Sequence, residues 1–159
     1  MNQRVMQQFV QSAHHGLLGR YYVGDQCGET PPHIVRVDPQ LNFNEISEMG
    51  AMPFPSCDVW RGQLLAPRTG DYEFTLDVDD SGWVTIDGTP VIHDPGAINK
   101  SHDAGTIHLT EGSHRIEVGE RNLGGGSYLH LFWKLPDSAD QEIIPANALI
   151  PDRAGIVRW

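Results

Sequence analysis

Residues 71–88, DYEFTLDVDDSGWVTIDG, constrain the fold of this chain more than any other stretch. Apolar side chains occupy every second position of its first half: Tyr72, Phe74, Leu76 and Val78. Polar residues alternate with them, and this period of two predicts a strand with one buried face. The turn formers at 79–82 end that strand, and a second short strand is expected at 83–86 before a tight turn at Asp87-Gly88. Asp79 and Asp80 are therefore expected at a loop tip.

The remaining β-prone runs are short and separated by turn residues. Strands are expected at 16–22, 59–66, 90–93 and 128–133, with a hairpin formed by 106–109 and 114–118. The segments expected to lack regular structure are 23–55, 94–104, 120–127 and 136–151. With 17 glycines, 11 prolines and no repeat, 159 residues predict one all-β domain, a sandwich or a barrel. We place it at 16–152, between a linker or short helical segment at 1–15 and a tail at 153–159.

Charge and composition exclude several classes of function. The 11 basic against 21 acidic residues give a formal charge of -10, which repels phosphate backbones and anionic membranes. No apolar run approaches the ~20 residues of a spanning helix, and no secretion signal is present. Cys27 and Cys57 permit one disulfide without requiring it.

Several segments together resemble the protective-antigen-fourteen domain family, named after the anthrax toxin protective antigen. They are GLLGRYY, VWRGQLLAPRTGDYEFTLDVDDSGWVTIDGTPVI, HLTEGSHRIEVGE, LHLFW and IPANALIP, which span 16–151. The resemblance implies an antiparallel β-sandwich. It also implies a place outside the cell or on its surface, as part of a larger protein.

In the sugar-binding members of that family, two successive aspartates joined by a cis peptide hold a calcium ion that binds sugar hydroxyls. The resemblance places these aspartates at Asp79 and Asp80. The second calcium loop falls at 120–127, where Asn122 is the available side chain. Calcium takes six to eight oxygen ligands at roughly 2.3–2.6 Å. Adjacent side chains of an extended chain point to opposite sides, so two neighbouring aspartates share one ion only if the backbone between them is contorted.

Further residues could complete a ligand site beside these loops. Gly124 and Gly125, with Gly126, allow main-chain carbonyls to approach an ion. Trp83 and Tyr128 flank the loops and offer aromatic faces for a sugar ring, unless they belong to the core. Trp60 and Trp133 lie within apolar runs and are expected to be buried. The competing interpretation of 79–82 is an ordinary solvated turn.

The sequence contains no recognisable catalytic signature. Neither a GxSxG nor an HExxH pattern is present, and the exposed His-Asp pairs at 93–94 and 102–103 lack metal-site spacing. We therefore expect a non-catalytic, calcium-dependent carbohydrate-binding domain whose partners are a glycan and a neighbouring catalytic domain. The alternative is a metal-free structural or protein-interaction module of a carbohydrate-active enzyme.

Overall fold

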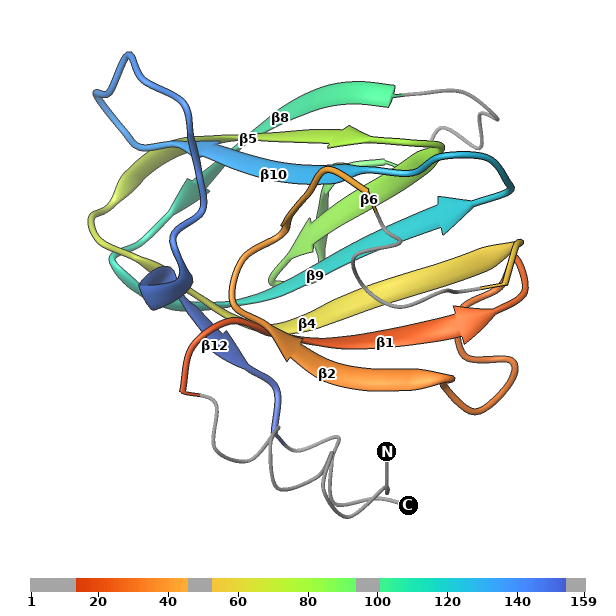
Figure 1. The fold of residues 1–159 in the computed structure, drawn as a ribbon. Coiled ribbons are helices and arrows are strands. Elements are labelled where there is room, and N and C mark those ends of the chain that lie inside the picture. Colours follow the sequence, from red (N-terminus) through yellow and green to blue (C-terminus); the bar gives the residue numbers. More distant parts are fainter. Residues whose placement is uncertain (1–13, 46–52, 94–100, 154–159) are drawn as a thin grey trace.

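A computed structural model describes residues 14–45, 53–93 and 101–153 as two packed antiparallel β-sheets (Figure 1). The first is seven-stranded, in the order β2-β1-β4-β9-β6-β7 with β12 paired to β4. The second is five-stranded, in the order β11-β10-β5-β8 with β3 paired to β10. The predicted all-β sandwich is confirmed. The linker and tail predicted at the termini lie largely outside the described residues and stay predictions.

The strand bounds follow the predicted runs closely in the middle of the chain. The seven-stranded sheet contains β1 (Leu17–Val23), β2 (Ile34–Asp38), β4 (Ser56–Ala66), β6 (Ser81–Ile86), β7 (Thr89–Ile92), β9 (Gly112–Asn122) and β12 (Leu149–Pro151). The five-stranded sheet contains β3 (Asn42–Phe43), β5 (Gly70–Val78), β8 (Ser101–Leu109), β10 (Leu129–Lys134) and β11 (Glu142–Ile143). A single turn of 3-10 helix, η2 (Ala146–Ala148), precedes β12.

The space between the sheets is filled by the alternating apolar residues. The inward side chains of β5 are all buried, and they meet Trp60 of β4 and Trp133 of β10, which are 0% and 2% exposed. Burying apolar surface of this kind stabilises a fold by about 25 cal/mol per Å². Both tryptophans are thus core residues, as predicted.

Two predicted connections are wrong because alternation reveals which face of a strand is buried but not which sheet the next strand joins. The stretch 79–80 is no hairpin tip, since β5 belongs to the five-stranded sheet and β6 to the seven-stranded one. The predicted hairpin of 106–109 and 114–118 is likewise a crossing, since β8 pairs with β5 whereas β9 pairs with β4 and β6. The turn at Asp87-Gly88 is confirmed: it joins β6 to β7 with positive φ at both residues.

Four stretches predicted to lack regular structure contain strands. Residues 34–38 and 42–43 form β2 and β3, and residues 120–122 continue β9. Residues 101–104 begin β8, while the preceding part of that predicted loop lies outside the described residues. The closing segment 136–151 contains β11 and β12. These strands are short or carry polar residues on one or both faces, so their apolar pattern is weak. Among the described residues, no helix has the length and apolar character to span a bilayer.

Cys27 and Cys57 form a disulfide, which resolves a question that the sequence left open. The bridge ties the β1–β2 connection to β4 and closes a loop with a sequence separation of 30 residues. Replacing both cysteines by alanine is expected to lower the free energy of unfolding by about 3 kcal/mol, because the unfolded chain regains loop entropy. Urea denaturation of the double variant measures this loss. An unchanged unfolding midpoint would contradict it.

Candidate functional site

Asp79 and Asp80 connect the two sheets, and hydrogen bonds join them to the end of β9 and to the segment that follows it. Their peptide bond is cis. The Asp79 N–H donates to the carbonyl of Tyr128 at 3.1 Å, and the Asp80 N–H donates to the carbonyl of Arg121 at 3.2 Å. The Asp80 Oδ2 accepts a hydrogen bond from the Leu123 N–H at 2.7 Å. Asp80 is only 8% exposed, so this segment is not the solvated turn of the competing interpretation.

The two predicted calcium loops therefore lie side by side. Asn122 is the last residue of β9 and is fully buried. Its Oδ1 accepts a hydrogen bond from the Gly124 N–H at 3.0 Å, which shapes the start of the glycine loop. Gly124 and Gly125 are exposed and have positive φ, which a residue with a side chain rarely adopts. The structure thus brings Asp80 and Asn122 to the same loop junction.

The two aromatic residues predicted to bind sugar lie in different places. Tyr128 is half-buried beside Asp79, and burial together with the charges of Asp77 and Asp79 raises the pKa of its hydroxyl. The ring of Trp83 instead covers Gly119 on the outer face of the seven-stranded sheet, where a Cβ on Gly119 would lie 1.9 Å from the indole. Arg121 packs over that indole at 5.7 Å from the ring centroid. Only Tyr128 is placed at the Asp79-Asp80 junction.

Behind the junction, a row of buried polar side chains continues into the sandwich. Glu120 and Asp58 are register partners on β9 and β4, and they are 0% and 1% exposed. Ser56 and Asn122 form the next pair toward the loops and are fully buried. Within the described part of the chain, both Glu120 carboxylate oxygens and the Asn122 Nδ2 lack a hydrogen-bond partner. Unpartnered buried polar groups are costly, which makes this row the least satisfied part of the interior.

Three aspartates influence the electrostatics of the buried Glu120. Burial raises the pKa of Glu120 well above its usual value, and the charges of Asp58, Asp79 and Asp80 raise it further. Burial also raises the pKa of Asp58 to about 7, and the charge of Asp38 contributes to the rise. A bound cation would relieve this concentration of negative charge.

The side chains at the junction offer oxygen donors, the kind of ligand that a hard cation such as calcium prefers. Among the residues that the structure describes, no three His, Cys, Asp or Glu side chains are arranged to hold one metal ion. A cation here would therefore draw on the two aspartates, the Asn122 amide oxygen, main-chain carbonyls and water, a ligand set typical of calcium. The unpartnered Glu120 beneath them supports the fit.

Sequence reasoning missed Asp58 and treated Glu120 only as the start of a loop. At both positions, the alternation of inward and outward side chains along the strand indicates an inward-facing residue. Glu120 lies two residues beyond Val118, and Asp58 two residues before Trp60, so each shares the inward face of a buried neighbour. Continuing the alternation past the last apolar residue would have placed both carboxyls inside.

The structure is an all-β sandwich of two antiparallel sheets, with an acidic crossing and a glycine loop joined at one end. The chain belongs to the PA14 domain family, whose sequence profile matches residues 13–147. The resemblance to the protective-antigen-fourteen domain is thereby confirmed. A comparison with curated protein sequences finds no match for this chain.

Solved structures share this fold at low sequence identity. An anti-sigma factor domain-containing protein is 24% identical with a TM-score of 0.76, over 87% of this chain and 48% of its own. This chain thus spans about half of that structure's length. A PA14 sugar-binding domain from an RTX adhesin is 16% identical with a TM-score of 0.72, over 87% of this chain and 99% of its own. An α-xylosidase from Xanthomonas citri is 17% identical with a TM-score of 0.61, over 82% of this chain and 16% of its own.

Proposed function

We propose that this chain is a non-catalytic, calcium-dependent carbohydrate-binding domain of a larger extracellular or cell-surface protein. The observation that carries the proposal is that the Asp80 carboxylate is held by the Leu123 N–H beside Asn122, while the charges of Asp79 and Asp80 act on the buried, unpartnered Glu120. The sugar-binding adhesin domain of the same fold supports the ligand class. The disulfide supports an oxidising compartment.

Each residue at the junction has a distinct task in this proposal. Asp79 and Asp80 provide charged oxygens, and the Leu123 N–H holds the Asp80 carboxylate in place. Asn122 offers its amide oxygen while fixing Gly124. Bound calcium would supply coordination positions that sugar hydroxyls occupy in place of water. Tyr128 then borders the ligand.

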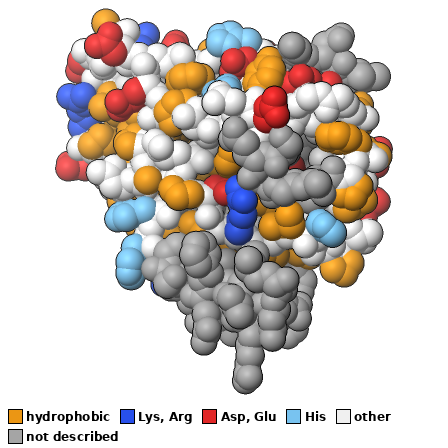
Figure 2. All heavy atoms as spheres, viewed as in Figure 1, with side chains coloured by type: hydrophobic (Ala, Val, Ile, Leu, Met, Phe, Trp, Pro, Cys, Tyr) orange, Lys and Arg blue, Asp and Glu red, His pale blue; other side chains and the backbone are white. Residues whose placement is uncertain are grey.

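The charges of the chain suit a neutral or hydroxyl-rich ligand rather than a polyanion. On the face shown in Figure 2, acidic and histidine side chains are scattered, while Lys and Arg side chains are few and separated. The formal charge of -10 of the whole chain likewise repels a polyanionic ligand. A small open site of this kind binds weakly, so useful affinity requires several copies or a tethered partner domain.

A glycan array probed with a tetramerised form of the domain tests the proposal. We expect binding in millimolar calcium that disappears in excess chelator and in Asp79→Asn. Asp140→Asn, at an exposed aspartate remote in sequence from both loops, is the matched control and should bind like the parent. Glycan binding that persists unchanged in chelator would refute the calcium dependence, and an empty array in calcium would refute the sugar.

The second candidate is a metal-free structural or interaction module beside a catalytic domain. The α-xylosidase comparison favours it, because this fold there makes up only 16% of a longer chain. A folded Asp79→Asn variant that still associates with its neighbouring domain in chelator would support this candidate.

A further inference from the structure

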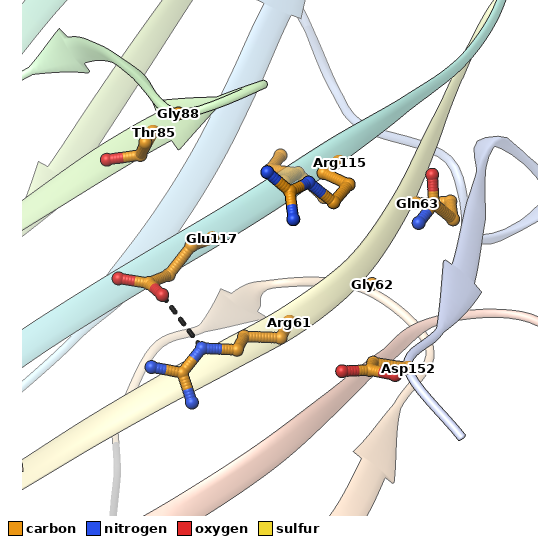
Figure 3. A pocket seen from close by; sticks show the side chains of 9 residues that line it. Arg61, Gly62, Gln63, Thr85, Gly88, Arg115, Glu117 and Asp152 are labelled. Carbon is orange, nitrogen blue, oxygen red and sulfur yellow. Dashed lines mark hydrogen bonds and ion pairs between the residues drawn. The ribbon is translucent and has the colours of Figure 1, made fainter. Parts of the chain in front are cut away.

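The outer face of the seven-stranded sheet carries a pocket that the proposed calcium site does not use. Its volume is about 460 Å³, within the ~300–1,000 Å³ of small-ligand sites. Figure 3 shows side chains of β4, β6 and β9 around it, with the chain after β12 at one side. The polar side chains that line it are Arg61, Gln63, Thr85, Arg115, Glu117 and Asp152.

The pleat of the sheet places these groups on one face in register. Glu117 of β9 lies between Arg61 of β4 and Thr85 of β6, because both are its register partners. One step along the same face, Arg115 is the register partner of Gln63. Alternate residues of a strand share a face, so two guanidinium groups, a carboxylate, an amide and a hydroxyl face the same space.

Two hydrogen bonds hold the carboxylate of Glu117 at the centre of the pocket. Glu117 accepts a hydrogen bond from the Arg61 Nε at 2.7 Å (Figure 3). It also accepts one from the Trp83 Nε1 at 3.0 Å. These bonds outweigh partial burial and lower the pKa of the Glu117 carboxyl, which therefore stays ionised at neutral pH. Trp83 is itself fixed between Gly119 and Arg121. Trp83 is thus a positioning residue of this pocket rather than a stacking platform at the Asp79-Asp80 junction.

The charges indicate what the pocket accepts. Arg61 and Arg115 are balanced by Glu117 and Asp152, so the lining has donors and acceptors but little net charge. Such alternation suits neighbouring hydroxyl groups, each of which donates to a carboxylate and accepts from a guanidinium. An apolar peptide would leave these groups unpaired, and a polyanion would meet the two carboxylates.

We propose that this pocket is a second binding site for a sugar residue, one that needs no metal ion. The choice of a saccharide rests on the proposed function, whereas the geometry of the pocket does not depend on Asp79 or Asp80. The two sites share no residue, since this pocket is lined by outward side chains of β4, β6 and β9, whereas Asp79 and Asp80 lie at the crossing between the sheets beside Leu123 and Tyr128. Two sites on one domain would raise avidity for a branched or repeating glycan.

A chelator-based NMR titration tests the second site separately from the first. The full chain in excess chelator is titrated with the methyl glycosides of glucose, galactose, mannose and N-acetylglucosamine. At least one is expected to shift the amide resonances of Arg61, Gln63 and Glu117 in a saturable way. Arg115→Ala and Glu117→Gln should each weaken binding at least tenfold, whereas Arg68→Ala, an exposed arginine outside the pocket, should not.

The outcomes distinguish the two proposals. Saturable shifts at the pocket that survive in Asp79→Asn uphold the second site even if the calcium site fails. If all four glycosides leave these resonances unmoved in a folded protein, the second site is overturned. Equal affinity in the parent, Arg115→Ala and Glu117→Gln would overturn it as well, because the sugar would then bind elsewhere.

Discussion

Calcium is expected to raise the thermal midpoint of the chelated protein by roughly 10 °C. At a free calcium concentration of about a thousand times the Kd, binding to the folded state alone adds about 4 kcal/mol to the free energy of unfolding. For a domain of this length, each kcal/mol shifts the midpoint by about 2–4 °C. The expected physical source is the negative charge of Asp79 and Asp80 beside the buried Glu120, which a bound cation would offset.

Asp80→Asn tests this prediction most specifically. An asparagine oxygen still accepts the hydrogen bond that the Leu123 N–H gives to Asp80, so the loops stay tied while one charge is removed. We expect the variant to fold and to lose most of the calcium-induced shift. Magnesium should stabilise the parent far less, because it prefers a compact octahedral shell and retains its waters. Differential scanning fluorimetry measures the thermal midpoints of the parent and the variant in calcium and in chelator, and of the parent in magnesium. Equal shifts in the parent and in Asp80→Asn would count against the assigned site.

The second large effect is a pH dependence that Asp58 imposes on the chelated protein. The folded pKa of Asp58 is about 7, against an ordinary value of 3.8, so the folded state holds this proton more tightly. Stability from this group is therefore present at low pH and falls as pH rises from about 4 to about 7. The difference in pKa corresponds to a loss of roughly 4 kcal/mol. Asp58→Asn removes the titration.

Urea denaturation in chelator at pH 4.5, 6 and 8 measures this effect. The unfolding free energy of the parent should fall as pH rises across the series, and that of Asp58→Asn should fall much less. The stability of the variant relative to the parent should therefore increase with pH. The quantity compared is how the difference in unfolding free energy between the parent and Asp58→Asn changes with pH. Any packing cost of the amide is the same at every pH and therefore cancels. Asp25→Asn, at an exposed aspartate, should follow the parent. Parallel curves for the parent and Asp58→Asn would show that Asp58 is not held protonated.

The strands with one buried face were predictable because burial repeats with a period of two. Tyr72, Phe74, Leu76 and Val78 are all buried, and the turn at Asp87-Gly88 follows from residues that tolerate positive φ. The partner of each strand was not predictable. Alternation carries no information about which sheet a strand enters, so β5 and β6 looked like a hairpin although they lie in different sheets.

The candidate site was also predictable only in part. The family resemblance pointed to Asp79, Asp80 and Asn122, and the structure places them at one junction. Trp83 flanks the acidic loop in sequence, yet its outward phase on β6 directs it to Glu117 on the other surface. The burial of Asp58 and Glu120 was not predicted because charged residues are rarely buried unless paired, although each shares the inward face of a buried neighbour on its strand.

A crystal structure determined in millimolar calcium tests the central claim most directly. The proposed function predicts an ion between the carboxylates of Asp79 and Asp80, with the Asn122 amide oxygen and main-chain carbonyls completing oxygen ligands at roughly 2.3–2.6 Å. Ordered Asp79 and Asp80 side chains that contact only protein and water at that calcium concentration would contradict it.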